Sequence, residues 1–170
     1  DTRRFVAALP PELFVAGAPL YLTRAQRRLD LMGGVSDYSG GLCLEWPLQC
    51  ATHCAVQRTD DGQVIVHSAN AAARGWQPRV SRTVAELLAS RTAWSAAPAE
   101  KWARYALGAI PVLAAEYSGF VPSGARIFIT SEVPPGAGLA SSAALEVAVL
   151  QALIAAFELP PANAQGTGEG

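Results

Sequence analysis

The first part of the chain alternates apolar and polar residues with a period of two, which is typical of strands. Residues 18–32, APLYLTRAQRRLDLM, alternate in short stretches and predict a strand, a turn and a second strand. Residues 42–48 (LCLEWPL) and 51–58 (ATHCAVQR) each predict a further strand. The turn residues TDDG then lead into QVIVHS (63–68), so the runs on either side of this turn are expected to form a hairpin.

Helical spacing replaces alternation in the second part of the chain. Residues 83–90, TVAELLAS, predict a helix that begins with Thr83 as N-cap. Residues 99–118 predict a longer helix, which Pro111 is expected to kink or split. A strand over 125–132 and a helix from about 139 to 158 complete the chain. A β-rich part followed by helix, strand, loop and helix predicts an α+β fold, with a mixed or antiparallel sheet and helices on one side.

The composition indicates a substantial hydrophobic core and argues against nucleic-acid and membrane partners. The chain has 170 residues, 51% of them hydrophobic, and a formal net charge of −1, which suits one globular domain. Without a basic excess or a Lys/Arg block, no nucleic-acid partner is expected. No apolar run is long enough to span a membrane. The start, DTRRFVAALPPELF, looks superficially like a twin-arginine signal, but Pro10, Pro11 and Glu12 cut it short, so a cytoplasmic location is expected.

Cys50, His53 and Cys54 cluster in CATHCAV, a pattern that raises the question of a metal site. No second Cys/His pair follows at a zinc-site spacing. Cys50 and Cys54 also fall on one face of the predicted strand. We therefore interpret them as buried or half-buried strand residues.

The stretch PPGAGLASSAA (134–144) separates a predicted strand from a predicted helix. Gly136 and Gly138 let the backbone approach a ligand closely, and the first N–H groups of the helix favour an anion. Ser141 and Ser142 add hydroxyls that can cap the helix, bind phosphate or hold Mg²⁺. This arrangement is typical of a phosphate-binding loop; a tight turn before a capped core helix is the structural alternative.

Two other nucleotide motifs do not fit. A Walker loop needs a lysine, and the chain's one lysine, Lys101, is far away in sequence. A dinucleotide fingerprint needs a third glycine where Ser141 stands, and its ribose-binding acid would be Glu158, at the end of a helix. A nicotinamide oxidoreductase is therefore disfavoured.

Two motifs resemble the GHMP small-molecule kinases, a family that includes galactokinase, homoserine kinase and mevalonate kinase. PPGAGLASSAA is similar to the phosphate loop of that family. AQRRLDLMGGVSDYSGG (25–41) resembles the galactokinase signature A-P-G-R-x-N-x-I-G-E-H-x-D-Y-x-G-G, and the two motifs occur in the family's order. The resemblance covers residues 18–158. It implies a ribosomal-protein-S5-domain-2-like, ATP-binding amino-terminal domain over residues 1–170, without the family's carboxy-terminal domain.

The resemblance implies the following site residues. ATP would be bound by the loop residues Pro135, Gly136, Ala137, Gly138, Leu139, Ala140, Ser141, Ser142 and Ala143, with Ser142 also holding Mg²⁺. Arg28 matches the arginine near the transferred phosphoryl group and is the candidate catalytic residue. Gly34, Asp37 and Tyr38 would form the sugar site, with Asp37 accepting hydrogen bonds from sugar hydroxyls. Asp30 is interpreted as a structural residue of the loop and Tyr38 mainly as a packing residue.

Departures from the signature bear on the substrate. Gly34-Val35 stand where galactokinases have Glu-His, so the motif is closer to the sugar kinases grouped with L-arabinokinase. The smaller pair would suit a sugar that lacks a hydroxymethyl group, with L-arabinose first and galactose second. No tryptophan is singled out for adenine, so Trp46, Trp76, Trp94 and Trp102 are interpreted as core residues.

The family's catalytic base and its carboxy-terminal half do not match any part of this chain. The chain alone is therefore expected to be inactive and to expose apolar surface that the other half would cover. A catalytically silent, kinase-like regulator that binds sugar and ATP is the alternative function.

Overall fold

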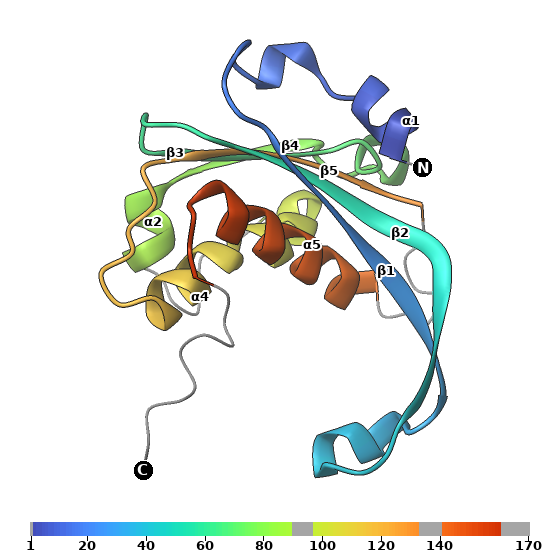
Figure 1. The fold of residues 1–170 in the computed structure, drawn as a ribbon. Coiled ribbons are helices and arrows are strands. Elements are labelled where there is room, and N and C mark those ends of the chain that lie inside the picture. The colour runs from blue at the N-terminus through green and yellow to red at the C-terminus, as the bar shows by residue number, and fades with distance from the viewer. Residues whose placement is uncertain (1, 90–96, 133–140, 161–170) are drawn as a thin grey trace.

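The computed structural model describes residues 2–89, 97–132 and 141–160, and its elements follow the predicted order from strands to helices (Figure 1). The strands are β1 (Tyr21–Met32), β2 (Leu44–Arg58), β3 (Gln63–Ser68), β4 (Arg79–Thr83) and β5 (Ala125–Ser131). The α-helices are α1 (Thr2–Ala7), α2 (Val84–Ala89), α3 (Arg104–Leu107), α4 (Ala109–Glu116) and α5 (Ser141–Ala156). Short 3-10 turns are η1 (Pro11–Leu13), η2 (Gly34–Ser39), η3 (Ala72–Arg74) and η4 (Pro98–Ala103).

The five strands form one mixed sheet in the order β1-β2-β5-β3-β4. The prediction of a hairpin between β2 and β3 was wrong, because β5 lies between them, antiparallel to β2 and parallel to β3. A parallel pair needs a long crossover, and the segment from β4 through α4 supplies it. Sequence alternation gives the faces of a strand, but it does not identify the strand's neighbour.

Residues 18–32 and 42–58 were each predicted as two short pieces, and each forms one continuous strand. β1 and β2 pair antiparallel from Tyr21–Val56 to Met32–Leu44, with register shifts between Gln26 and Arg28 and between Asp30 and Met32. The breaks in alternation that suggested separate strands correspond to these register shifts. There the paired strands bend at a β-bulge, but their pairing continues.

The helices α2 to α5 cover one face of the sheet, as predicted, and enclose the main core (Figure 1). α5 packs on β1 and β2, and the Thr23 hydroxyl donates to the Ala148 carbonyl at 2.7 Å. Cys54 is fully buried and Cys50 partly buried, which confirms their interpretation as strand residues. Burial raises the pKa of the Cys54 thiol.

The opposite face of the sheet carries α1, a helix that the sequence analysis did not predict (Figure 1). A second, smaller core forms there from Phe5, Leu13, Ala55 and Phe128. The buried Gln57 side chain fixes this segment by accepting from the Val15 N–H at 2.7 Å and donating to the Val15 carbonyl at 3.0 Å. The segment that looked like an export signal is thus part of the fold. Within the described residues, no helix has the length and apolarity to cross a membrane.

Two local predictions can be checked at single residues. Thr83 caps α2: its hydroxyl accepts from the Glu86 N–H at 3.1 Å, while the Glu86 carboxylate accepts from the Thr83 N–H at 2.7 Å. The helix predicted over 99–118 is split, but at Gly108 between α3 and α4. Pro111 lies in the first turn of α4, where the missing N–H costs no helical hydrogen bond.

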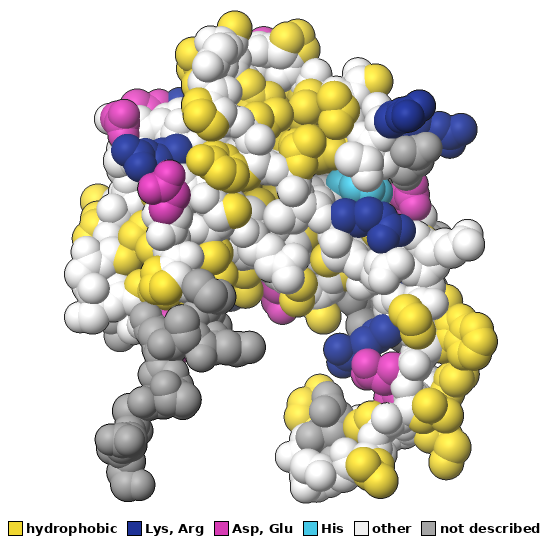
Figure 2. All heavy atoms as spheres, viewed as in Figure 1, with side chains coloured by type: hydrophobic (Ala, Val, Ile, Leu, Met, Phe, Trp, Pro, Cys, Tyr) yellow, Lys and Arg dark blue, Asp and Glu magenta, His cyan; other side chains and the backbone are white. Residues whose placement is uncertain are grey.

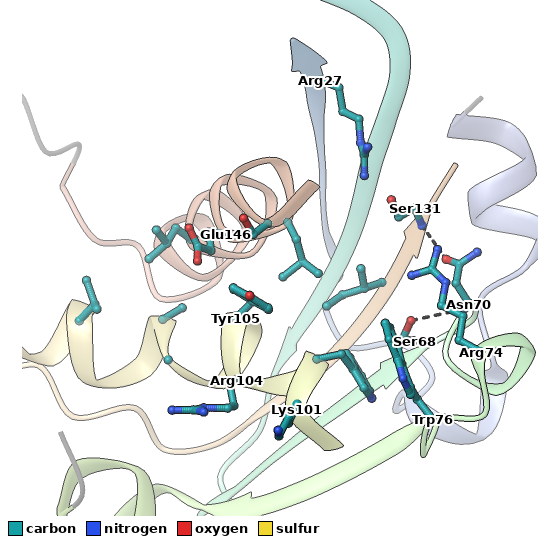
Figure 3. A pocket seen from close by; sticks show the side chains of 18 of the residues that line it. Arg27, Ser68, Asn70, Arg74, Trp76, Lys101, Arg104, Tyr105, Ser131 and Glu146 are labelled. Atoms are coloured by element: carbon teal, nitrogen blue, oxygen red, sulfur yellow. Dashed lines mark hydrogen bonds between the residues drawn. The ribbon is translucent and has the colours of Figure 1, made fainter. Parts of the chain in front are cut away.

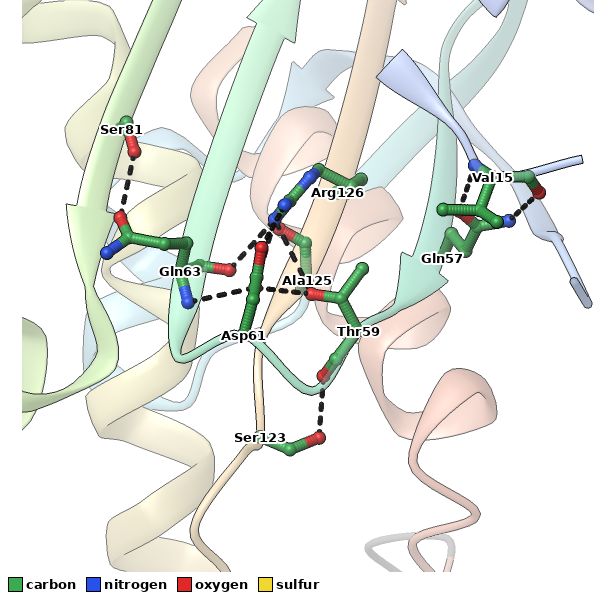
Figure 4. A network of polar contacts seen from close by, with 9 residues as sticks. All are labelled: Val15, Gln57, Thr59, Asp61, Gln63, Ser81, Ser123, Ala125 and Arg126. Carbon is green, nitrogen blue, oxygen red and sulfur yellow. Dashed lines mark hydrogen bonds and ion pairs between the residues drawn. The ribbon is translucent and has the colours of Figure 1, made fainter. Parts of the chain in front are cut away.

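A polar network joins the β2–β3 turn to the start of β5 (Figure 4). The Arg126 guanidinium forms an ion pair with Asp61 and also donates to the Gln63 carbonyl at 3.2 Å. The Ser123 hydroxyl donates to the Thr59 carbonyl at 2.7 Å. The Arg126 partnership holds the pKa of Asp61 down at about 2. This network holds β5 in its place between β2 and β3.

The outer halves of β1 and β2, with η2 at the tip, project from the body of the domain as an arm of residues 28–46 (Figure 1). Apolar side chains gather on this arm (Figure 2). Those most exposed are Leu29, Leu31, Met32, Tyr38, Leu42, Leu44 and Trp46. The arm is held by backbone pairing, and it lies outside both cores.

Candidate functional site

A cleft of about 1000 Å³ opens between the beginning of α5, the helices η4 and α3, and the ends of β3 and β5 (Figure 3). It is lined by Arg27, Ser68, Asn70, Arg74, Trp76, Pro98, Lys101, Trp102, Arg104, Tyr105, Gly108, Ala109, Val112, Ile129, Ser131, Ser142, Leu145, Glu146 and Leu150. The sheet turns its inner face to the helices here, so the cleft is partly apolar and partly charged.

The charge of this cleft differs from that of the whole chain. Four of the described lining residues are cations, namely Arg27, Arg74, Lys101 and Arg104, against one carboxylate, Glu146. The chain as a whole carries a formal charge of −1. Cations collected in a cleft with low-dielectric walls attract anions more strongly than the same charges on an open surface. The cleft therefore suits a ligand with several negative charges.

Arg27 is the cation in this cleft that is most deeply buried. β1 alternates, so that Thr23 and Ala25 face α5 and the core, and Arg27 continues this inward row. Its side chain is 2% exposed, and its Nε and Nη1 atoms have no hydrogen-bond partner among the described residues. Burial, only partly offset by the nearby Cys50 and reinforced by Arg74, lowers the pKa of the Arg27 guanidinium.

A small hydrogen-bonded frame fixes the opposite wall. The Asn70 side-chain carbonyl accepts from the Ser131 N–H at 2.7 Å, and the Ser68 hydroxyl accepts from the Asn70 N–H at 3.3 Å. Figure 3 shows Arg27 pointing from β1 toward the end of β5, where this frame lies. The wall is thus set in position before any ligand arrives.

The tryptophans lie in different environments, although all four were expected to be core residues. Trp102 is 8% exposed and donates from Nε1 to the Gln77 carbonyl at 2.8 Å, which confirms that interpretation for this residue. Trp46 is 61% exposed on the arm, where the interpretation was wrong. Trp76 is half-buried, lines the cleft and lies 5.3 Å under the Arg74 guanidinium. Trp94 falls outside the described residues.

Of the predicted phosphate loop, Pro135, Gly136, Ala137, Gly138, Leu139 and Ala140 fall outside the described residues. Ser141 begins α5, as its predicted position at the helix start requires. Ser142 lines the cleft, and Glu146 lies one turn further along the same helix and lines it too. A serine hydroxyl and a carboxylate are oxygen ligands of the kind that Mg²⁺ takes together with nucleotide phosphates. The donor set therefore fits Mg²⁺.

Arg28, the candidate catalytic residue, does not line the cleft. Its side chain forms an ion pair with Glu45 at 2.6 Å, at the base of the arm. It also borders a smaller hollow of about 270 Å³, which the first turns of α5 reach through Ala143 and Val147. Arg27 lines both hollows and so lies between them.

The predicted sugar-site residues lie on the arm. The Asp30 carboxylate accepts from the Gly34 N–H at 2.6 Å, which confirms Asp30 as a structural residue of this loop. Gly34 has a φ of +38°, a value that favours glycine. Tyr38 is 92% exposed, so its interpretation as a packing residue is wrong within this chain. The side chain of Asp37 is outside the part of the chain that the structure describes.

Comparison with known proteins gives a consistent result. Residues 104–165 match the family model for the GHMP kinases N terminal domain. The chain is 31% identical to the L-arabinokinase of Arabidopsis thaliana, in a match that covers 82% of this chain and 16% of that protein.

The fold is also shared with solved structures. The galactokinase of Lactococcus lactis, solved in complex with galactose, matches 94% of this chain and 37% of its own chain, with a TM-score of 0.73 and 25% identity. The mevalonate kinase of Methanococcus jannaschii matches 86% of this chain and 43% of its own, with a TM-score of 0.65 and 16% identity. The resemblance stated from the two motifs, and the α+β fold class, are thereby confirmed. The chain spans less than half the length of each of these proteins.

Proposed function

Since this chain carries the N-terminal domain of the GHMP kinases, we propose that it forms the nucleotide-binding half of an ATP-dependent sugar kinase. In this reaction the bond between the γ-phosphorus and its bridging oxygen breaks, and a sugar hydroxyl oxygen takes the phosphoryl group. ADP leaves, and the hydroxyl proton passes to a base. The anomeric hydroxyl is the proposed acceptor, as in the sugar kinases that the signature resembles.

The observation that carries the proposal is the cationic cleft at the beginning of α5. Among the described lining residues, four cations face one carboxylate there, beside a helix start whose N–H groups and dipole favour phosphate. Phosphoryl transfer depends on positioning and on neutralising the charge of the phosphates. A triphosphate carries the negative charge that such a cleft requires.

Each part of the nucleotide has a proposed partner. The loop of residues 135–140 and the first residues of α5, Ser141, Ser142 and Ala143, would bind the phosphates. Ser142 and Glu146 would hold Mg²⁺, which neutralises phosphate charge when bound. Trp76, half-buried on the cleft wall, offers a face on which adenine can stack.

The sugar is proposed to bind near the base and tip of the arm, through Arg28, Gly34, Asp37 and Tyr38. Arg28 would approach the transferred phosphoryl group, for which its ion pair with Glu45 would have to yield or reorient. L-arabinose is the first candidate substrate and galactose the second. The relative at 31% identity is an L-arabinokinase, which supports that order.

We also propose that a further domain of the full-length protein packs against the arm and contributes the catalytic base. The exposed apolar side chains of the arm support this, because water-exposed apolar groups of this number are more typical of an interface. The chain by itself is then expected to be inactive. A cytoplasmic location, where ATP is supplied, is part of the same proposal.

The direct test follows ADP release by the full-length gene product with MgATP. The panel of acceptors contains L-arabinose, galactose, glucuronate, a heptose phosphate, homoserine and mevalonate. Turnover with one sugar supports the proposal and identifies the substrate. Binding of ATP and a sugar without turnover on any acceptor would favour the regulatory alternative instead.

A double substitution tests the sugar preference. Replacing Gly34-Val35 by Glu-His restores the residues of the galactokinase signature. We expect the ratio of kcat/KM for L-arabinose over galactose to fall by about 10-fold, since the new side chains would meet a hydroxyl that only the hexose presents. An unchanged ratio would contradict this assignment.

A further inference from the structure

We infer that Arg27 is a phosphate-binding residue of the cleft, a role that neither motif assigns to it. The inference rests on the proposed function, because it names a further contact to the same nucleotide. In the alignment of AQRR with the signature's A-P-G-R, Arg27 stands where the signature has glycine and Arg28 where it has arginine. The chain therefore has one more cation at this point than the signature requires.

The Arg27 side chain points to the inner side of the sheet. Thr23, Ala25 and Arg27 follow one another on the inner face of β1, while Arg28 forms its ion pair with Glu45. The register shift between Gln26 and Arg28 falls at Arg27 itself. Such irregularities in a strand often redirect a side chain beside a binding site. Figure 3 shows the guanidinium pointing into the cleft.

This arrangement is costly. Arg27 is 2% exposed, and its Nε and Nη1 atoms, unpartnered among the described residues, have lost water without gaining the hydrogen bonds that would replace it. Arg74 and Lys101 line the same cleft and add like charge. An anion would relieve both penalties at once, by accepting hydrogen bonds and by neutralising charge.

The lining residues indicate the chemistry of that anion. Ser131 and Ser142 line the cleft from the end of β5 and the start of α5, so their hydroxyl groups lie around the same space. A guanidinium is a planar, two-pronged donor that matches the oxygens of a phosphate. Several cations in one cleft favour a di- or triphosphate over a singly charged group. The phosphates of the nucleotide meet these conditions.

The test compares affinities of the full-length protein for MgATP, MgADP, adenosine and inorganic tripolyphosphate. For Arg27→Gln we expect the affinity for ATP and tripolyphosphate to fall about 10- to 100-fold, the effect of losing a charge-assisted contact, with adenosine unchanged. Arg27→Lys should retain part of the affinity. Arg24→Gln, an exposed arginine on the outer face of the same strand, is the matched control and should bind as the unmodified protein does.

A thermal denaturation without nucleotide separates binding from folding. If Arg27 serves the ligand, Arg27→Gln should have an equal or higher Tm, because it removes an uncompensated buried charge. A lower Tm together with equal losses for ATP and adenosine would mean that Arg27 is structural, and would overturn the inference. Unchanged ATP affinity would overturn it too.

Failure of the proposed function is recognised separately. An unmodified protein that binds tripolyphosphate but no adenine nucleotide would contradict the nucleotide proposal. Arg27 would still be supported as an anion-binding residue if Arg27→Gln then lost the tripolyphosphate. An unmodified protein that binds neither ATP nor tripolyphosphate would overturn both.

Discussion

Two arginines on different strands of the same sheet have different surroundings. Arg126 on β5 has an exposed side-chain fraction of 16% and contacts Asp61 and the Gln63 carbonyl (Figure 4). Arg27 on β1 is more deeply buried, yet its Nε and Nη1 find no partner within the described part of the chain. Within the described residues, the guanidinium of Arg126 is well partnered, whereas two nitrogen atoms of the Arg27 guanidinium are buried without a partner, which costs stability.

The comparison teaches how to separate a structural cation from a functional one. Burial is common to both residues, so burial alone does not decide the role. The partners decide the role. The Arg126 network holds the β2–β3 turn and β5 together, whereas Nε and Nη1 of Arg27 have no acceptor in the described part of the chain, and a phosphate would provide one. These different surroundings predict effects of different size for substitutions in the Arg126 network and in the cleft.

The largest effect is expected from Gly124→Ala, inside the Arg126 network. Gly124 has a φ of +148°, and a Cβ there would lie 2.6 Å from the Thr59 Oγ1 and 2.9 Å from an Asp61 carboxylate oxygen. Strain and displacement of the network should lower the free energy of unfolding by about 2–4 kcal/mol. Urea denaturation measures this change.

Gly119→Ala is the control that measures the strain of a positive φ without a steric clash. Gly119 has a φ of +82°, but a Cβ would meet nothing within 4 Å. This substitution should lower the free energy of unfolding by about 1 kcal/mol. Equal losses at Gly119 and Gly124 would show that the close approach to the network has no energetic weight.

The second change is the direct comparison of Arg126→Met with Arg27→Met. Methionine keeps much of the apolar stem and removes the charge. Arg126→Met should lower the free energy of unfolding by about 2 kcal/mol, because several charge-assisted hydrogen bonds are lost. Arg27→Met should leave it unchanged or raise it. Equal destabilisation of both variants in urea would mean that Arg27, like Arg126, is a structural residue.

The third change tests the aromatic wall of the cleft. Trp76→Leu should weaken binding of ATP and adenosine alike by about 10-fold, the size of a lost base–aromatic contact. This differs from Arg27, where only the phosphates are concerned. Trp46→Leu, on the arm and away from the cleft, is the matched control for nucleotide binding. A selective loss of ATP, with adenosine unaffected, would argue against stacking at Trp76.

The smallest effect on stability is expected from Asp61→Asn, and it depends on pH. Its folded pKa of about 2 lies below the value near 4 of an unfolded aspartate, so the carboxylate stabilises the fold above pH 4. That contribution is lost as the pH falls through about 2. Asp61→Asn should cost about 1 kcal/mol at pH 7, since the partly exposed pair is screened by water.

Urea denaturation of Asp61→Asn and the unmodified protein at pH 7, 4 and 3 measures this difference. The difference in free energy of unfolding between the two proteins should be smallest at pH 3. Asp60→Asn, in the same turn but without a contact to Arg126, serves as control. A gap that stays constant down to pH 3 would assign the effect to something other than the ion pair.

Several features of the fold could be predicted from local sequence. The N-cap at Thr83 and the strand predicted over 125–132 depend on short-range chemistry, and the structure has both, the strand as Ala125–Ser131. The helix after the glycine loop begins within the expected range. The break at Gly108 was placed at Pro111 instead, because proline is disfavoured only beyond the first turn of a helix.

The candidate site was only partly predictable. Ser142 was expected at the phosphates and lines the cleft, whereas Lys101 was set aside because it is far away in sequence. The sequence did contain a signal for Arg27, since the alternation of Thr23 and Ala25 places it on the inner face. The motif favoured Arg28 instead. For Trp76 and Arg74, which meet only through the turn after β3, no local pattern distinguishes them from surface residues.

Periodicity and two short motifs were enough to indicate the resemblance to the GHMP kinases, the α+β class and the order of strand, loop and helix. Tertiary structure alone decided that β5 separates β2 from β3, that α1 covers the outer face, and that four scattered cations share one cleft. The physical reason is distance along the chain: alternation and capping act over a few residues, whereas strand neighbours and the electrostatics of a cleft depend on residues that only folding brings together.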